Sequence, residues 1–108
     1  MLERNVAFTL SNEKVIEKLL DEEALAINHM VLPPDTGLPE HITNAPVYMI
    51  VVRGQIDLQL NGQESHTYQA GRIILIPYKV QMKAHNASTF ITELFVVKAP
   101  GPRSMAGK

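Results

Sequence analysis

The chain has 108 residues, 45% of them hydrophobic, which is enough for one folded domain with a single core. Ten basic and eleven acidic residues give a net charge of −1 without any run of Lys or Arg, so we expect neither nucleic-acid binding nor attachment to an anionic membrane. The absence of cysteine excludes disulfides, thiolate metal sites and thiol nucleophiles. The first ten residues lack the apolar core of a signal peptide, and no apolar run approaches the roughly 20 residues of a membrane span, so we expect a cytoplasmic protein.

The segment from residue 11 to residue 23 is locally ambiguous. Ser11 or Asn12 begins it, and both are residue types that cap helices. Four apolar residues follow at helical spacing, namely Val15, Ile16, Leu19 and Leu20. This spacing favours an amphipathic helix when the segment is taken alone.

From Ala24 onward the sequence pattern is that of an all-β protein. Short apolar runs alternate with clusters of Gly, Pro and Asn, which indicates a sandwich or barrel of closely spaced strands. The clearest element is a hairpin between Gln55–Leu60, where apolar and polar residues alternate, and His66–Tyr68. Asn61 and Gly62 lie between the two strands and tolerate the positive φ angles that a tight turn requires.

Three further runs are apolar on both faces, namely Val47–Val52, Ile73–Ile76 and residues 90–97. A strand of this kind needs a core on one side and another layer or subunit on the other. Residues 99–108 show no apolar periodicity. We therefore expect one domain, covering residues 1–108, with a core from about residue 24 to 98 and a loose tail from 99 to 108.

Two spaced motifs flank the hairpin. The first, "GLPEHITNAPVYMIVVRG", runs from Gly37 to Gly54 and leads from a turn through one histidine into a strand. The second starts at Gly71, reaches Pro77 after five residues and ends at Asn86. Together they resemble the two motifs of the cupin superfamily over about residues 24–98. The resemblance implies an all-β barrel of the double-stranded β-helix, or jelly-roll, type, and it makes residues 14–20 a strand rather than a helix.

In cupins that bind a metal, two His and a Glu of the first motif and one His of the second converge inside the barrel. This chain has His41, Thr43, Val47 and Met82 at those positions, so the resemblance implies a ligand only at His41. Octahedral and tetrahedral metal sites both need several strong protein ligands. We therefore predict no cofactor. A divalent metal bound by His41 together with His29 or Met82 is the disfavoured alternative.

The alternation of side chains along a strand predicts which residues line the barrel. Met49 shares the parity of Val47 and should point inward with it. The predicted ligand pocket is mainly apolar, as ligand pockets usually are, and consists of His41, Thr43, Val47, Met49 and Met82.

The opposite face of the same strand predicts a partner. Tyr48, Ile50 and Val52 should face outward, where an apolar row needs cover. We therefore expect a homodimer, and homodimers are frequent in the family that the chain resembles.

The leading functional hypothesis is a barrel that binds a small molecule in this pocket without a metal centre and without catalysis. His41 is then either a polar group of the pocket or a half-buried histidine bonded to a backbone carbonyl. The alternative is a metal-dependent enzyme of the dioxygenase or isomerase type that uses His41 with unconventional ligands. A third reading is a purely structural or regulatory dimer with a filled barrel. No catalytic residue is identified from the sequence.

Overall fold

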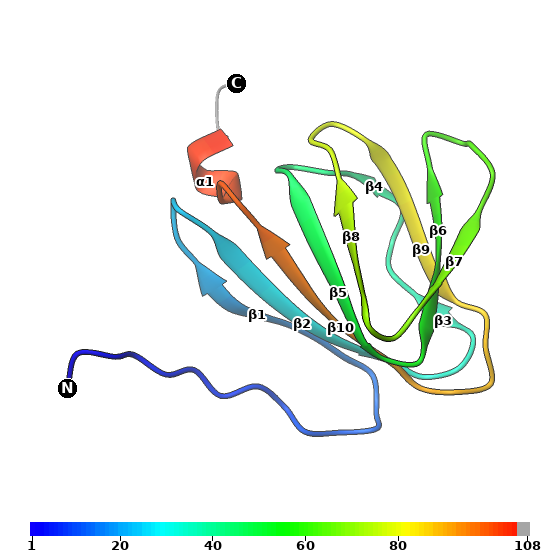
Figure 1. The fold of residues 1–108 in the computed structure, drawn as a ribbon, viewed down its shortest axis with the longest axis horizontal. Coiled ribbons are helices and arrows are strands. Elements are labelled where there is room, and N and C mark those ends of the chain that lie inside the picture. The colour runs from blue at the N-terminus through cyan, green and yellow to red at the C-terminus, as the bar shows by residue number, and fades with distance from the viewer. Residues whose placement is uncertain (106–108) are drawn as a thin grey trace.

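The computed structural model describes residues 1–105 and is built almost entirely of strands (Figure 1). Within these residues the strands are β1 (Val15–Asp21), β2 (Ala26–Leu32), β3 (Thr36–Gly37), β4 (His41–Ile42), β5 (Val47–Arg53), β6 (Gln55–Leu60), β7 (His66–Gln69), β8 (Arg72–Ile76), β9 (Gln81–Asn86) and β10 (Thr92–Lys98). Sheet A has the order β1-β2-β10-β5-β8, and sheet B has the order β3-β9-β6-β7, with β4 also paired to β9. Every pairing is antiparallel, and the all-β prediction is confirmed.

The predicted hairpin is β6 and β7. Asn61 and Gly62 at its turn have φ angles of 52° and 67°, both in the left-handed region that a tight hairpin turn uses. Their positions therefore explain both where β6 ends and how the chain reverses.

The ambiguous N-terminal segment is a strand. β1 lies at the edge of sheet A and pairs with β2 from Val15 opposite Val31 to Asp21 opposite Ala26. The helical spacing of its apolar residues is a local feature, and backbone pairing to β2 outweighs it. The strand that the family resemblance implied is the correct assignment.

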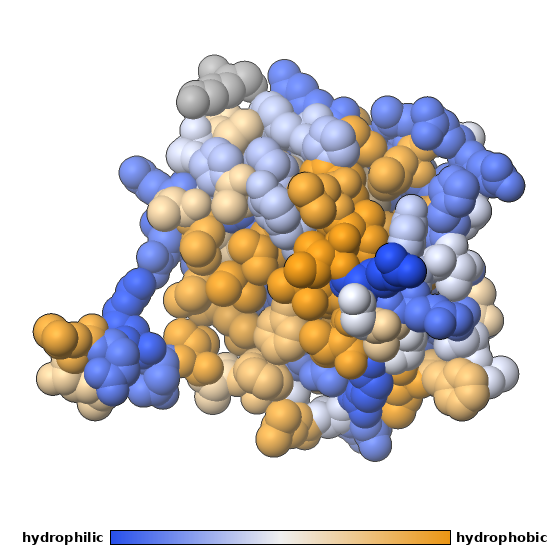
Figure 2. Space-filling view, viewed as in Figure 1, coloured by the Kyte–Doolittle hydropathy of each residue, from blue (hydrophilic) through white to orange (hydrophobic). Residues whose placement is uncertain are grey.

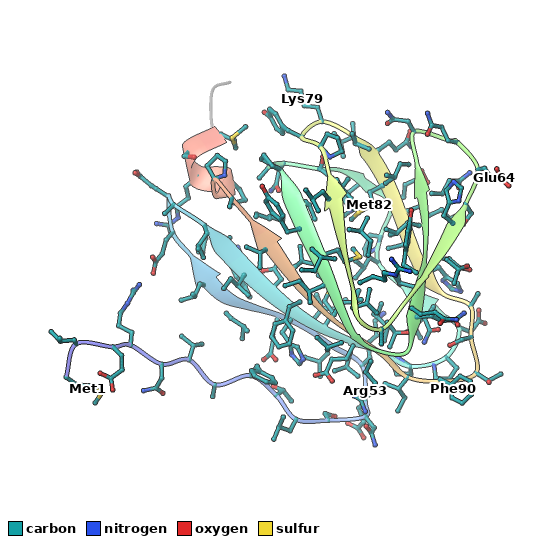
Figure 3. All side chains as sticks on the ribbon, in the orientation of Figure 1. Met1, Arg53, Glu64, Lys79, Met82 and Phe90 are labelled. Atoms are coloured by element: carbon teal, nitrogen blue, oxygen red, sulfur yellow. The ribbon has the colours of Figure 1, made fainter. Side chains whose placement is uncertain are left out.

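The core fills the space between the two sheets. Alternate residues of β5 and β9 point into it, including Val47, Met49, Met82 and Ala84. Figure 3 shows Met82 between the sheets. This alternation agrees with the parity predicted from the sequence, and it places the motif positions Val47 and Met82 inside the barrel.

The segment after β10 differs from the predicted loose tail. Gly101 is buried, and its N–H donates a hydrogen bond to the Glu23 carbonyl over 2.9 Å. A side chain at Gly101 would collide with the Glu22 carbonyl, so only glycine allows this close approach. A short helix, α1 (Pro102–Met105), follows. The prediction was wrong for residues 99–105, and residues 106–108 lie outside the described part of the chain.

The N-terminal residues run as an extended arm along and beyond sheet A (Figure 1). Phe8 contacts the outer face of the sheet, whereas Met1 and Leu2 are fully exposed. Among residues 1–105 no helix is long and apolar enough to cross a membrane.

Candidate functional site

A cavity of about 200 Å³ lies between the inner face of sheet A and the part of sheet B formed by β4, β9 and the loop between β3 and β4. Most of its wall is apolar and consists of Ile16, Met30, Leu38, Pro39, Val47, Met82 and Val96. Four polar side chains complete the lining, namely Asn28, His41, Thr43 and Lys98. The cavity therefore combines a large apolar surface with a few polar groups, which is the composition of small-molecule sites.

His41 lies at the edge of this cavity and is exposed. It stands opposite Met82 in the pairing of β4 with β9, and its Nδ1 is 2.9 Å from the Pro39 carbonyl oxygen. A neutral imidazole that donates through Nδ1 is an acceptor at Nε2. The two readings of His41 thus coexist, because it bonds a backbone carbonyl and also lines the cavity.

Thr43 has a structural task besides lining the cavity. Its hydroxyl donates a hydrogen bond to the Pro77 carbonyl over 2.7 Å and accepts one from the Val80 N–H over 3.0 Å. The side chain is buried, so these bonds connect the end of β4 to the turn between β8 and β9. Its only hydroxyl proton is already used, so Thr43 can offer a ligand a lone pair but no donor.

The other predicted pocket residues divide into two groups. Val47 and Met82 line the cavity beside His41 and Thr43. Met49 points inward as expected, but it is fully buried in the core cluster and lies outside the cavity wall. Its inclusion in the pocket was therefore wrong, since inward parity does not distinguish the packed part of a barrel from the hollow part.

Asn28 and Lys98 were missed by the sequence reasoning. In the pairing of β2 with β10, Asn28 stands opposite Val96, and Lys98 is two residues further along the same face. Diagonal neighbours of this kind lie about 7–8 Å apart. Alternation along β10 was the available signal, since it places Lys98 on the same side as Val96.

The electrostatics of the cavity are set by Lys98. Its ammonium donates a hydrogen bond to Asn44 Oδ1 over 2.9 Å. Burial lowers the pKa of Lys98, the charge of Lys18 lowers it further, and Asp21 acts in the opposite direction. None of the described residues that line the cavity is acidic. The cavity wall therefore presents a partly buried positive charge, and no carboxylate is among the described lining residues.

His29 does not join His41, contrary to the disfavoured metal alternative. Asn28 and Met30 line the cavity, whereas His29 between them is fully buried on the opposite face of β2. Both of its ring nitrogens are occupied, with Nδ1 2.7 Å from Glu17 and Nε2 2.7 Å from Glu93. That alternative was wrong for His29.

The donor atoms at the motif positions do not fit a metal. His41 with the Met82 thioether and the Thr43 hydroxyl falls short of the ligand sets that divalent ions require. Val47 occupies the carboxylate position and adds no charge. Within residues 1–105 no group of three or more His, Cys, Asp or Glu side chains is arranged to hold a metal ion.

The cluster around His29 attaches the N-terminal arm to sheet A. Phe8 and Phe95 pack against the imidazole with ring centroids 4.9 and 4.8 Å away. Thr9 donates through its N–H and its hydroxyl to Glu17, both over 2.9 Å. The Thr9 N–H, and next the hydrogen bond from His29, hold the pKa of Glu17 below its usual range.

A larger depression of about 650 Å³ lies along β7 and β8, the edge strands of the two sheets. Its lining includes Thr67, Gln69, Arg72, Ile73 and Leu75, all of which are exposed. None of the predicted pocket residues reaches it. We therefore take the smaller, more apolar cavity as the candidate site.

Comparison with known proteins identifies the family. No protein-family model matches the chain. The uncharacterised protein MJ0764 of Methanocaldococcus jannaschii is 42% identical over 92 residues, which are 85% of this chain and 79% of that protein. The crystal structure of an RmlC-like cupin family protein with a double-stranded β-helix fold, mj0764 of the same organism, superposes with a TM-score of 0.94 at 40% identity and covers 97% of both chains. The chain belongs to the cupin superfamily.

Solved structures of lower sequence identity share the fold. A conserved Klebsiella pneumoniae protein with a double-stranded β-helix domain gives a TM-score of 0.75 at 16% identity, covering 87% of this chain and 83% of its own. A Cupin 2 conserved barrel domain protein of Salinispora arenicola gives 0.70 at 17% identity, covering 90% of this cupin and 87% of its own chain. The double-stranded β-helix predicted from the two motifs is therefore confirmed.

Proposed function

We propose that this cupin binds a small molecule in the cavity between its two sheets. The observation that supports the proposal is an apolar hollow of about 200 Å³ at the positions where the family motifs converge. An apolar cavity of about 150 Å³ in another protein holds benzene. A ligand of about six to ten non-hydrogen atoms therefore matches the space in this barrel.

The polar residues of the cavity support binding over a purely structural role. His41 lies at its edge with Nε2 outside the Pro39 bond, and Asn28 and Lys98 lie on its wall on neighbouring strands β2 and β10. A few polar groups in an apolar wall orient a ligand and select among ligands. A barrel whose only task was to fold would gain more from closing this space, because an empty cavity forfeits packing contacts.

The methionines provide an internal test of the binding site. Met30 and Met82 line the cavity, Met49 is packed in the core, and Met1 lies at the exposed end of the arm. A fragment library screened by NMR on protein with ¹³C-labelled methionine methyl groups should shift the signals of Met30 and Met82. Met1 serves as the control, and single Met→Leu variants assign the signals.

The fragment screen has one outcome that supports the proposal and one that overturns it. Fragments that shift the Met30 and Met82 signals in a saturable way, and leave Met1 in place, support binding in the cavity. A library of small apolar, acidic and neutral polar fragments that shifts neither signal at millimolar concentration overturns the proposal.

We also propose that two copies of this cupin associate through the outer face of β5 and β8. Tyr48 stands opposite Leu75, and Ile50 stands opposite Ile73, so the apolar side chains form adjacent rows. Figure 2 shows this apolar surface over the centre of the visible face. The outward side chains of these rows carry no charge, so identical faces can meet without repulsion.

Light scattering coupled to size-exclusion chromatography tests the association. The wild-type protein should elute as a dimer, and Ile73→Lys should elute as a monomer, because a buried lysine in each copy would lose its hydration. Ile42→Lys is the matched control, since Ile42 is similarly exposed but lies on β4. A monomeric wild-type protein at micromolar concentration overturns the proposal.

A further inference from the structure

Asn28 carries a polar atom that the fold leaves without a partner. Its side-chain Oδ1 is buried and accepts no hydrogen bond from any described residue. An orphaned buried acceptor is unfavourable, so buried amides are normally bonded. Asn28 lines the cavity, which makes a bound ligand the natural source of the missing donor.

Lys98 supplies a second, independent recognition group on the same wall. It is the diagonal neighbour of Asn28 across the β2–β10 pairing, and both side chains line the cavity. One hydrogen bond of its ammonium goes to Asn44. An ammonium has three donors, so the group has capacity for an anionic partner as well.

The charges around Lys98 favour an anion over a cation. Lys18 stands opposite Asn28 in the β1–β2 pairing, and its positive charge acts on Lys98. The nearby carboxylate, Asp21, is 3.6 Å from Lys18 Nζ and 3.5 Å from the Arg103 guanidinium, so its charge is shared between two other cations. Burial lowers the pKa of Lys98, and an ammonium that has lost hydration gains more from a carboxylate than an exposed one does.

We propose that the ligand is a small monocarboxylic acid that also carries a hydroxyl or N–H donor close to its carboxylate. Its apolar body occupies the hollow beside Met30, Met82 and Val96, its carboxylate accepts from Lys98, and its donor bonds Asn28 Oδ1. A 2-hydroxy acid carries both ligand groups close together and represents this class. This inference names the ligand class of the proposed binding function and rests on it.

Three related probes separate the two contacts. The first is 2-hydroxy-4-methylpentanoate, which has the apolar body, the hydroxyl and the charge. The second is 4-methylpentanoate, which lacks the hydroxyl. The third is 2-hydroxy-4-methylpentanamide, which keeps the hydroxyl and lacks the charge. Each is titrated by NMR against the Met30 and Met82 methyl signals of the full chain.

Two variants assign the contacts to residues. Lys98→Met keeps an unbranched side chain, one atom shorter, and removes the charge. It should weaken binding of the hydroxy acid about tenfold or more while leaving the amide unchanged. Asn28→Leu should weaken the hydroxy acid at least about threefold and leave 4-methylpentanoate unchanged. Both variants should remain folded by circular dichroism, since backbone hydrogen bonds hold the β2–β10 pair together.

The results distinguish this inference from the proposed function. Preference for the hydroxy acid over both analogues, lost in the matching variant, supports it. Equal affinity for the acid and the amide, or an acid affinity that Lys98→Met leaves unchanged, overturns it while leaving cavity binding intact. If none of the three probes moves the Met30 and Met82 signals although other fragments do, the acid assignment is wrong; if no fragment does, the binding function itself fails.

Discussion

Replacing His29 by leucine should lower the free energy of unfolding by about 3 kcal/mol, because His29 joins two carboxylates beneath the N-terminal arm. The imidazole is fully buried, with Nδ1 and Nε2 each 2.7 Å from a carboxylate oxygen of Glu17 and Glu93. Leucine has a similar volume and retains contact with Phe8 and Phe95, so the substitution removes mainly the two charged hydrogen bonds.

The size of this loss in unfolding free energy depends on the solvent exposure of the cluster. A hydrogen bond to a charged group contributes about 1.5–3 kcal/mol, and His29→Leu removes one such bond from each of two carboxylates. The carboxylate side chains keep 26% and 17% of their surface exposed, so water replaces part of the lost interaction. The lower end of the range therefore applies. For a domain of about this length, it corresponds to a fall in melting temperature of about 12–24 °C.

Urea unfolding followed by circular dichroism at pH 7 measures the effect, and His85→Leu is the matched control. His85 is also paired with a carboxylate, at 3.0 Å from Asp35, but the two side chains are 41% and 94% exposed. Exposed pairs of this kind contribute less than about 1 kcal/mol. Adding Glu17→Gln to His29→Leu should recover part of the loss by removing one of the two facing charges. An unfolding free energy for His29→Leu equal to that of His85→Leu would refute the reasoning.

Three further results are expected. Thr43→Val should cost about 1–3 kcal/mol in urea unfolding, because it leaves the Val80 N–H and the Pro77 carbonyl without their buried partner; a loss below about 0.5 kcal/mol would contradict the role assigned to the hydroxyl. The pKa of Glu17 is held below its usual range, so its contribution to stability is present above about pH 4.3 and is lost as the pH falls through the lower pKa of the folded state. Glu17→Gln should therefore flatten the acid side of the plot of unfolding free energy against pH. An unchanged plot would contradict this. Protein purified without a histidine tag should contain substoichiometric metal by elemental analysis, with no change in His41→Ala, whereas stoichiometric metal lost in that variant would favour the metal-dependent alternative.

The fold was predictable where a local pattern coincides with a structural need. Asn61 and Gly62 have the φ angles that their residue types favour, and the strands before and after them alternate as half-buried strands do. β1 was not predictable from its own residues, since their spacing suits a helix and only the pairing with β2 makes them a strand. The anchored segment around Gly101 was missed for a similar reason, because its contact with Glu23 is distant in sequence.

The alternation of side chains along a strand predicted part of the candidate site. Parity places Val47 and Met82 inside the barrel, and the structure puts both on the cavity wall. Parity cannot tell which inward residues face a hollow, so Met49 was included although it is packed on all sides. The position of Lys98 beside Asn28 depends on the register between β2 and β10, which no single stretch of sequence reveals.

The residues at the motif positions make this barrel less suited to a cation than a cupin with the metal ligands in place. A carboxylate at Val47 or an imidazole at Met82 would be buried beside the core, and without a metal an ionised group there would cost several kcal/mol. Valine and methionine avoid that cost and add apolar contacts instead. Positive charge reaches the cavity from Lys98, which is part of the protein and not an exchangeable ion. A divalent cation entering the cavity would meet a like charge, whereas an organic acid would meet an opposite one. The substitutions that remove the metal ligands and the lysine on β10 therefore favour the same outcome, a barrel suited to an anionic ligand.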